Sequence, residues 1–250
     1  MNPIFYQEDA KQWLQTAASI HKSIQKQLAL DQENHHLFVE TQPEKEIITF
    51  KEAGERYSIS QYYELDDKVL LLKGDLHIKG DLNREWITNC LKGMTWTGNL
   101  YGIMIDGNLV VQGDIMDNPP IQVYVLKNLT CNFIYSEDGA ITINGDAIIK
   151  YGAYGHYNDG LLICFGSFKT PYIIDSGHCI PDEAKCEHLF FTATDKEDQE
   201  LVCIPYSEEV PEDSYVLLNP AVWDEDNQFS VTNFYNLVKI GENPFEINVQ

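Results

Sequence analysis

The chain has 250 residues, of which 44% are hydrophobic, and its 39 acidic against 17 basic residues give a formal net charge of −22 at pH 7. Nucleic-acid binding requires Lys and Arg to displace counterions from phosphates, so this charge excludes the usual mode of that binding and disfavours anionic membrane surfaces. No stretch approaches the roughly 20 apolar residues of a membrane span, and the first residues lack the basic start and apolar run of a signal peptide. We therefore expect a cytoplasmic protein with one sizeable core.

The N-terminal region carries an amphipathic pattern between Glu8 and about Leu30. Apolar residues fall at steps of 4, 3, 4 and 4 along one helical stripe, at Trp13, Ala17, Ile20, Ile24 and Leu28. This spacing predicts a helix. Residues 1–64 are predicted to form this helix and a cap, because a bare strand edge in the region that follows would recruit another chain. The helix is expected either to cover the first coil or to pack alongside it, and a helix offered to a partner protein is the other interpretation.

A short sequence motif recurs through the middle of the chain. It consists of a glycine, a small polar residue and an apolar residue. It occurs at Gly74-Asp75-Leu76, Gly80-Asp81-Leu82, Gly98-Asn99-Leu100, Gly107-Asn108-Leu109, Gly113-Asp114-Ile115 and Gly145-Asp146-Ala147. The glycines of this motif from Gly74 to Gly113 are 6, 18, 9 and 6 positions apart, and Gly145 and Gly166 are 21 apart, all multiples of three. Apolar residues alternate between them, which is the period of a strand with one buried face.

These repeats predict a mainly β fold over residues 65–175. Glycine followed by Asp or Asn supplies the positive φ and the local side-chain hydrogen bonds of a tight corner, so each repeat is typical of strand, corner and strand. Roughly 18 to 21 residues per circuit suits a parallel β-helix, a solenoid in which each coil buries the apolar side of the next. An antiparallel sandwich with Gly-Asp and Gly-Asn turns is the alternative.

At these residues the sequence resembles the bactofilins, polymer-forming cytoskeletal proteins whose repeats are also short apolar strands separated by Gly-x corners. The resemblance covers about Val69 to Asp175 and implies the solenoid fold. Bactofilins are nearly all solenoid with short tails, whereas more than half of this chain lies outside the repeats. The resemblance therefore leaves a self-assembling scaffold as one functional alternative.

The composition changes in residues 176–250, which we expect to pack on the solenoid as part of a single structural domain. Leu201 to Ile204 and Tyr215 to Leu218 have the pattern of strands, and Ser230 to Lys239 that of a short helix with Ser230 as N-cap and Gly241 past its end. Residues 182–250 hold 16 acidic and 3 basic residues. Much of the total charge is thus concentrated in the C-terminal region.

This acidity favours a basic protein partner, through long-range attraction and faster encounter. Aromatic residues, the usual anchors of interfaces, are interleaved with the acidic runs. Solvated acidic loops beside core aromatics would give the same pattern. The candidate partner-binding residues are Asp195, Glu197, Asp198, Glu200, Glu208, Glu209, Trp223, Asp224, Glu225 and Asp226.

Two further groups of residues are weaker candidates, one for metal binding and one for catalysis. His178, Cys179, Cys186 and His188 are zinc-type ligands within eleven residues, but their spacing matches none of the common zinc motifs, so we expect no metal. A carboxylate pair could serve a polysaccharide-cleaving β-helix enzyme. Most of the candidate aspartates are corner residues of the repeat, where hydrogen bonds to the local backbone account for the presence of aspartate. The candidates are Asp75, Asp81, Asp106, Asp114 and Asp146.

The sequence therefore favours a non-catalytic protein-binding protein without cofactor. In charge, size and lack of a catalytic motif it resembles acidic bacterial immunity proteins, which implies an inhibitor that covers the active site of a basic effector, such as a toxin or nuclease domain. We expect a monomer or a small homo-oligomer. The alternatives are the self-assembling scaffold and, less favoured, a polysaccharide-active enzyme.

Overall fold

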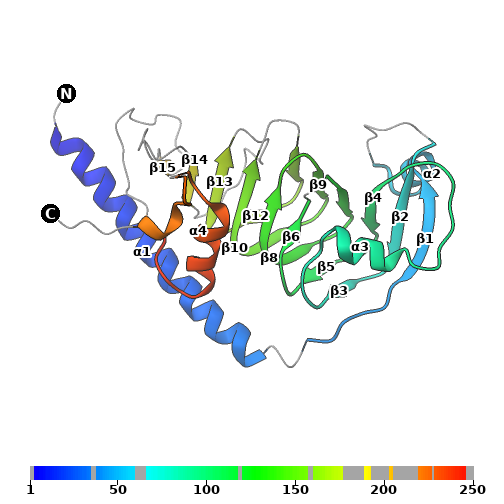
Figure 1. Cartoon of the computed structure of the whole chain (residues 1–250), viewed down its shortest axis with the longest axis horizontal. Helices are drawn as coiled ribbons and strands as arrows, with labels where there is room; N and C mark the ends of the chain where they lie inside the picture. Colours follow the sequence, from blue (N-terminus) through cyan, green and yellow to red (C-terminus); the bar gives the residue numbers. More distant parts are fainter. Residues whose placement is uncertain are drawn as a thin grey trace.

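Two sheets of mostly parallel strands form the walls of a β-solenoid in the computed structural model of the chain (Figure 1). The structure describes residues 3–34, 38–59, 66–117, 120–156, 160–176, 189–192, 203–204, 219–226 and 228–245. The predicted parallel β-helix is confirmed, and the antiparallel sandwich is wrong. A helical region lies at each end of the sequence.

The first sheet follows the order β1-β2-β4-β7-β9-β11, and the second contains the remaining strands. The strands of the first sheet are β1 (Glu44–Thr49), β2 (Lys68–Lys73), β4 (Leu100–Ile105), β7 (Gln122–Val125), β9 (Ala140–Ile143) and β11 (Leu161–Cys164). Those of the second are β3 (Leu76–Ile78), β5 (Leu109–Val111), β6 (Ile115–Met116), β8 (Leu129–Ser136), β10 (Ala147–His156), β12 (Phe168–Lys169), β13 (Tyr172–Ser176), β14 (Leu189–Thr192) and β15 (Cys203–Ile204).

The register of the first sheet aligns equivalent residues of successive coils. One column of paired residues consists of Leu72, Ile105, Val125, Ile143 and Cys164. The step from Leu72 to Ile105 is longer than the later ones because it includes helix α3 (Arg84–Cys90). This column lines the solenoid interior, where each fully buried aliphatic side chain contributes about 1.5–3 kcal/mol.

The corner glycines are needed for two different reasons. Gly74 and Gly80 have φ of 82° and 99°, as the sequence predicts. Gly107 and Gly145 do not have positive φ, so for them the predicted reason is wrong. A Cβ on Gly107 would instead lie 2.3 Å from the carbonyl oxygen of Gly74 in the preceding coil. Close approach of backbone between coils therefore selects glycine at these later corners.

The polar residues after these glycines form a ladder that runs from coil to coil. The Oδ1 atom of Asp75 accepts a hydrogen bond from the backbone N–H of Asn108 at 2.8 Å. Asn108, Asn128 and Asp146 repeat this contact toward the backbone N–H of the next coil, ending at Ser167, at 3.2, 2.9 and 2.8 Å. The predicted hydrogen bonds therefore exist but join neighbouring coils rather than closing each turn locally.

The ladder also gives the length of each coil. Its four hydrogen bonds join residues separated by 33, 20, 18 and 21 positions along the chain. The predicted circuit length therefore holds for every step except the first. That first step is the one that contains α3.

The first coil is covered by chain segments other than the N-terminal helix. Strand β1 pairs antiparallel with β2 and occupies the edge of the first sheet. At the second sheet, Thr41 donates its N–H to the carbonyl of His77 at 3.1 Å and accepts from the His77 N–H at 2.8 Å. Helix α2 (Phe50–Tyr57), which Thr49 and Glu52 start with a capping box, buries Phe50 on the outer face of the first sheet.

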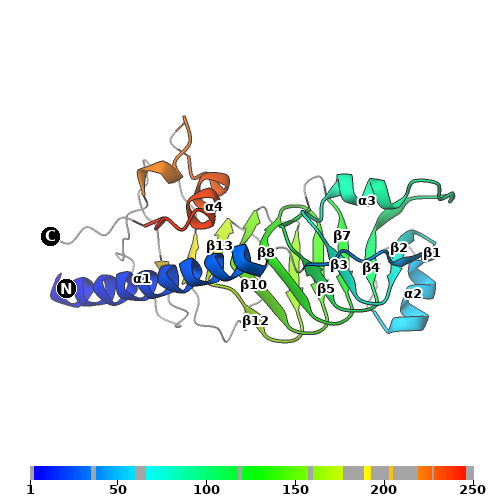
Figure 2. The same ribbon diagram turned by 90° about the horizontal axis from the view of Figure 1, so that it is seen from below.

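Helix α1 (Pro3–Asn34) packs alongside the later coils, so of the two predicted placements the lid on the first coil is wrong. Figure 2 shows α1 beside β10 and away from β1 and α2. The carboxylate of Asp31 accepts hydrogen bonds from Lys150 Nζ at 2.9 Å and from the Tyr151 hydroxyl at 2.9 Å. Ile24 is buried, and Gln25 donates to the carbonyl of Gly241 at 2.9 Å. The helix thus joins the solenoid to the C-terminal region.

The C-terminal lobe consists of η2 (Pro220–Val222), α4 (Val231–Lys239) and the described residues between and after them. The predicted helix is confirmed: the Ser230 side chain accepts from the Asn233 N–H at 3.2 Å, and Gly241 has φ of 77°. Helix α4 packs on β10 over a largely aromatic core. The predicted strand at 201–204 overlaps β15, and the one at 215–218 lies outside the described residues.

The Tyr172 hydroxyl is buried in this aromatic core and has no hydrogen-bond partner within the part of the chain that the structure describes. Burial raises the pKa of Tyr172, so the group stays neutral. We expect Tyr172→Phe to raise the free energy of unfolding by about 1 kcal/mol, because an unsatisfied buried hydroxyl costs its desolvation. Urea unfolding monitored by circular dichroism measures this. A loss of stability would mean that the hydroxyl has a partner.

Candidate protein interface

The structure describes one part of the predicted acidic interface, the segment from Trp223 to Asp226 between η2 and α4. The other predicted partner-binding residues lie outside the described residues: Asp195, Glu197, Asp198, Glu200, Glu208 and Glu209. The weak metal candidates lie outside them as well: His178, Cys179, Cys186 and His188. Among the residues that are described, no group of three or more His, Cys, Asp or Glu could hold a metal ion.

Trp223–Asp226 together with Gln228 and Phe229 forms a loop that we call the acidic hairpin. Trp223 and Phe229 pair as an isolated antiparallel bridge. The Asp224 N–H donates to the Gln228 carbonyl at 3.0 Å. Asp224 Oδ1 in turn accepts from the N–H groups of Asp226 at 2.9 Å and Gln228 at 2.8 Å. The Asp224 carboxylate therefore holds the loop closed, a structural role that the sequence pattern does not separate from binding.

Glu225 and Asp226 are the carboxylates that the hairpin presents to solvent. Both side chains are exposed, whereas Trp223 is half-buried against the aromatic core. The Asn233 side chain of α4 donates to the Trp223 carbonyl at 3.1 Å and fixes the hairpin to the helix. In Figure 2 the hairpin, coloured orange, projects away from the solenoid. The hydrogen bonds hold the hairpin backbone, which offers these exposed carboxylates to an approaching molecule.

A row of aromatic side chains runs from the outer face of the second sheet to Phe229 of the hairpin. We call Tyr135, Tyr154, His156 and Phe229 the aromatic wall. The ring centroids of Tyr154 lie 5.2 Å from Tyr135 and 6.4 Å from Phe229. His156 stacks on Tyr154 with an interplanar angle of 14°, and its Nδ1 is 3.0 Å from the Tyr154 hydroxyl. The wall thus connects β8 and β10 to the hairpin.

The sequence pattern does not identify the members of this wall that lie on the solenoid, namely Tyr135, Tyr154 and His156. Tyr135 and Tyr154 are register partners on adjacent coils, and Met116 of β6 pairs with Tyr135 on the preceding coil. The two steps in this column are equal in length and fall inside the predicted circuit. Aligning the coils at that period would therefore have found the column.

Glu137 and Asp117 are the carboxylates whose charge acts on the Tyr135 hydroxyl. Burial raises the pKa of Tyr135 to about 12, with further contributions from Glu137, Tyr154 and Asp117. Asp117 is fully buried and accepts from the Ser136 hydroxyl at 2.8 Å and from the Glu137 N–H at 2.6 Å. The raised pKa keeps the half-buried Tyr135 hydroxyl neutral.

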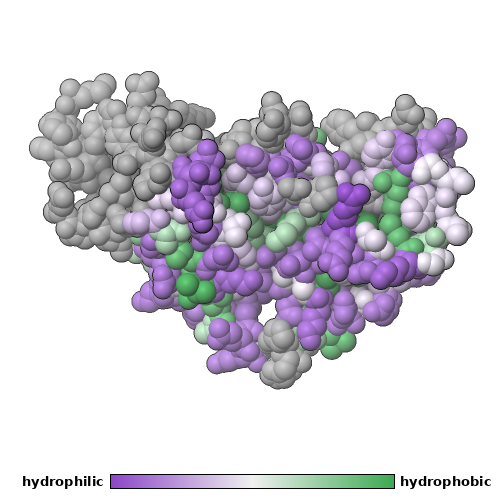
Figure 3. Space-filling view, in the orientation of Figure 1, coloured by the Kyte–Doolittle hydropathy of each residue, from purple (hydrophilic) through white to green (hydrophobic). Residues whose placement is uncertain are grey.

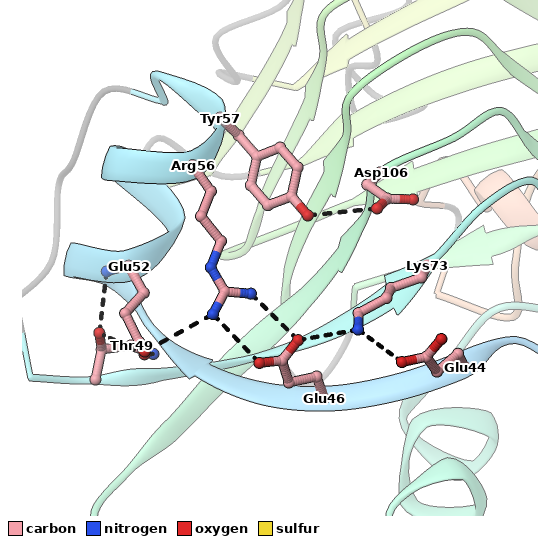
Figure 4. A network of polar contacts seen from close by, with 8 residues as sticks. All are labelled: Glu44, Glu46, Thr49, Glu52, Arg56, Tyr57, Lys73 and Asp106. Carbon is pink, nitrogen blue, oxygen red and sulfur yellow. Dashed lines mark hydrogen bonds and ion pairs between the residues drawn. The ribbon is translucent and has the colours of Figure 1, made fainter.

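A second charged cluster, on β1, β2 and α2, joins carboxylates to the basic side chains of Arg56 and Lys73 (Figure 4). Glu46 lies between Arg56 at 3.2 Å and Lys73 at 3.2 Å, and Lys73 also contacts Glu44 at 2.7 Å. Hydrogen bonds from Arg56 and Lys73 lower the pKa of Glu46. The cluster places charges along an edge strand, which discourages pairing with another chain. Its role is therefore structural.

The aspartates that could serve an enzyme are engaged in the fold. Asp75, Asp81 and Asp146 each accept a backbone N–H from the following coil. Asp106 accepts from the Gly74 N–H and from the Tyr57 hydroxyl. Asp114 is buried beneath Tyr235. The arrangement of these five carboxylates supports the structural explanation over a catalytic pair.

Most of the described surface on the face of Figure 1 is hydrophilic, with hydrophobic residues in small patches (Figure 3). Within the described residues, no helix is long and apolar enough to cross a membrane. Comparisons with protein-family models, with curated proteins and with solved structures find no match. We therefore infer function from the geometry of the hairpin and the aromatic wall.

Proposed function

We propose that the protein is a non-catalytic binding protein of the immunity type, which neutralises a basic effector or toxin by covering its active site. The observation that carries the proposal is the fixed presentation of Glu225 and Asp226 beside partly exposed aromatic side chains. Preformed carboxylates attract a basic surface over long range, and half-buried aromatics supply anchors at low cost in side-chain entropy. A nuclease or similar effector with a cationic active site is the partner of matching chemistry.

The covering of the first coil favours this function over a self-assembling scaffold. Head-to-tail stacking of solenoids needs an open strand edge at both ends. Strand β1 and Thr41 occupy the edges of β2 and β3, and β1 itself carries Glu44 and Glu46, whose ion pairs are drawn in Figure 4. Sedimentation across a concentration series separates the two candidates, since a binding protein remains a monomer or small oligomer while a scaffold grows into filaments.

Reversal of the hairpin charge should weaken partner binding. We expect Glu225→Lys with Asp226→Lys to slow association about tenfold at low salt and to reduce its dependence on salt, because long-range attraction contributes to encounter. Asp224 is left unchanged because its carboxylate closes the hairpin. The measurement is quantitative recovery of proteins from native lysate on the immobilised chain, followed by kinetics with the purified partner.

The matched control is Glu40→Lys with Glu55→Lys, two exposed carboxylates outside the C-terminal lobe that give the same change in net charge. A basic protein that is recovered by the wild type and the control but lost by the hairpin variant would support the proposal. Equal loss of the basic protein in both variants would mean that binding depends on the overall charge of the chain rather than on the hairpin. Recovery of no basic protein, together with filaments, would defeat the proposed function.

A further inference from the structure

Asp114 lies in the contact between the solenoid and the C-terminal lobe. It directly precedes β6, and its side chain is 5% exposed beneath α4. The Tyr235 hydroxyl of α4 donates to Asp114 Oδ1 at 2.6 Å, and the centroid of the Tyr235 ring lies 4.5 Å from that of Phe133 on β8. Docking of α4 therefore withdraws this carboxyl from water and encloses it beside aromatic rings.

The groups around Asp114 balance a negative charge only in part. The Tyr235 hydroxyl and the Phe133 N–H donate hydrogen bonds to it, and Lys239, whose Nζ lies 5.5 Å from the centroid of the Tyr235 ring, adds an attraction. Asp81 of the preceding coil opposes them, because its Oδ1 accepts the Asp114 N–H at 2.9 Å and brings a second carboxylate close. A buried carboxylate held by a hydroxyl and an amide rather than by a paired cation costs free energy, which the neutral acid avoids.

On the solenoid side, the lysine of β10 is already engaged with another carboxylate. Lys150 contacts the Asp31 carboxylate of α1 at 2.9 Å, and the neighbouring Tyr151 hydroxyl donates to the same carboxylate at 2.9 Å. On β8, burial raises the pKa of the Cys131 thiol, so that group stays neutral. These elements leave Asp114 dependent on its own proton for neutrality.

We propose that Asp114 is a proton-operated latch for the C-terminal lobe: its neutral carboxyl holds α4 on the solenoid, and its ionised form loosens α4. While α4 is docked, burial raises the pKa of Asp114 to about 6, whereas the solvated carboxyl of an open lobe has its ordinary pKa of 3.8. The docked state therefore binds more protons between these values. The ratio of open to docked lobe should rise about 50-fold from pH 4 to pH 7.

The lobe can open as a unit because side chains attach it to the coils. Strands of neighbouring coils are joined by backbone pairing, whereas α4 meets the coils through the Tyr235 hydrogen bond and aromatic packing. Segments attached in this way open at a lower free energy than the core. The hairpin follows α4, since Asn233 donates to the Trp223 carbonyl. The inference rests on the proposed function, because it makes the latch a regulator of how firmly the hairpin is held.

Amide hydrogen exchange of the full chain, read by mass spectrometry of peptic peptides, measures this opening. Peptides from α4 are compared with peptides from β4 and β7 between pH 4 and pH 7, as protection factors corrected for the intrinsic exchange rate. In the wild type, the α4 amides should be less protected than the coil amides, and their protection should fall about 50-fold over this range. Asp114→Asn keeps an oxygen acceptor for Tyr235 but cannot ionise, so it should lose this fall.

Two further variants control the comparison. Asp138→Asn removes an exposed carboxyl between β8 and β9 and should keep the pH dependence of the wild type. Tyr235→Phe removes a donor that stabilises the ionised carboxyl, so its α4 protection should fall further than that of the wild type. This variant decides the test if Asp114→Asn does not fold.

The outcomes separate the latch from the proposed function. Equal protection of α4 and coil amides would mean that the lobe and the solenoid unfold together, and the latch would be wrong. A fall in α4 protection that persists in Asp114→Asn would overturn it too. Neither result touches the proposed function, which the Glu225→Lys, Asp226→Lys variant tests with the native partner. A fall seen only in chains that retain Asp114 supports the latch, whatever the lysate experiment recovers.

Discussion

Gly107→Ala is expected to lower the free energy of unfolding by about 3 kcal/mol, at the upper end of the cost of overpacking. The added Cβ would lie 2.3 Å from the Gly74 carbonyl oxygen, 2.4 Å from its carbon and 2.6 Å from the Asp75 nitrogen. These are backbone atoms of the preceding coil, so no change of rotamer relieves the contact. Relief requires the coils to separate, which would stretch the ladder bond from Asn108 to Asp75. Urea unfolding at equilibrium measures the loss.

Gly93→Ala is the matched control for this experiment. Gly93 has φ of 80°, but a Cβ there would meet nothing within 4 Å. Its replacement should cost only about 1 kcal/mol, the strain of a left-handed backbone conformation. If both variants lost the same stability, conformation rather than contact between coils would determine the need for glycine, and the explanation for the later corners would be wrong.

The second large effect concerns Asp114, a buried carboxyl beneath α4. Its Oδ1 accepts a hydrogen bond from the Tyr235 hydroxyl at 2.6 Å, and Asp81 and Lys239 are the charges that act on it. Burial raises the pKa of Asp114 from 3.8 to about 6, and the Tyr235 hydrogen bond limits the rise. The folded protein therefore binds more protons than the unfolded chain between these two values.

The contribution of Asp114 to stability must then fall as the pH rises from about 4 to about 6, since the free energy of unfolding decreases wherever the native state binds more protons. The contribution is about 3 kcal/mol, from a shift of roughly two pKa units. We expect the difference in stability between the wild type and Asp114→Asn to decrease by that amount over this range. Subtracting the pH profile of the variant from that of the wild type removes the contributions that the other carboxylates make to stability. The measurement is urea unfolding at a series of pH values.

Tyr235→Phe extends this test. The variant removes the hydrogen bond that lowers the pKa of Asp114, so the fall in stability should continue to higher pH than in the wild type. A difference profile that stays flat for Asp114→Asn would show that the carboxyl is not desolvated in the folded state. An unchanged profile in Tyr235→Phe would show that its hydroxyl does not stabilise the charged form.

The solenoid is predictable because the spacing of the repeated glycine motif indicates the length of each coil. Glycine at the corners and apolar alternation at Leu76-His77-Ile78 give the coil length without any long-range information. The role of the glycines is only half predictable, because Gly74 and Gly107 approach each other from successive coils that are distant in the sequence. The residues of a single corner do not indicate what stacks on it.

The packing of the two ends is not predictable in the same way. The apolar stripe of α1 is evident in the sequence. The surface against which the helix packs is set by the contacts of Asp31 with Lys150 and Tyr151, which are remote along the chain. The candidate site also has a predictable and an unpredictable part. The acidic residues of the hairpin are evident in the sequence. Tyr135 and Tyr154 become neighbours only through the register of β8 and β10.

The unequal coil lengths have a practical consequence. The step from Leu72 to Ile105 accommodates α3 and the residues after it while β2 and β4 still pair in parallel. The fold therefore tolerates extra sequence between Leu82 and Leu100 without losing alignment of the stack. This position, remote from the C-terminal lobe in Figure 1, is where a fluorescent reporter or an affinity handle could be grafted for imaging the protein with its target still attached.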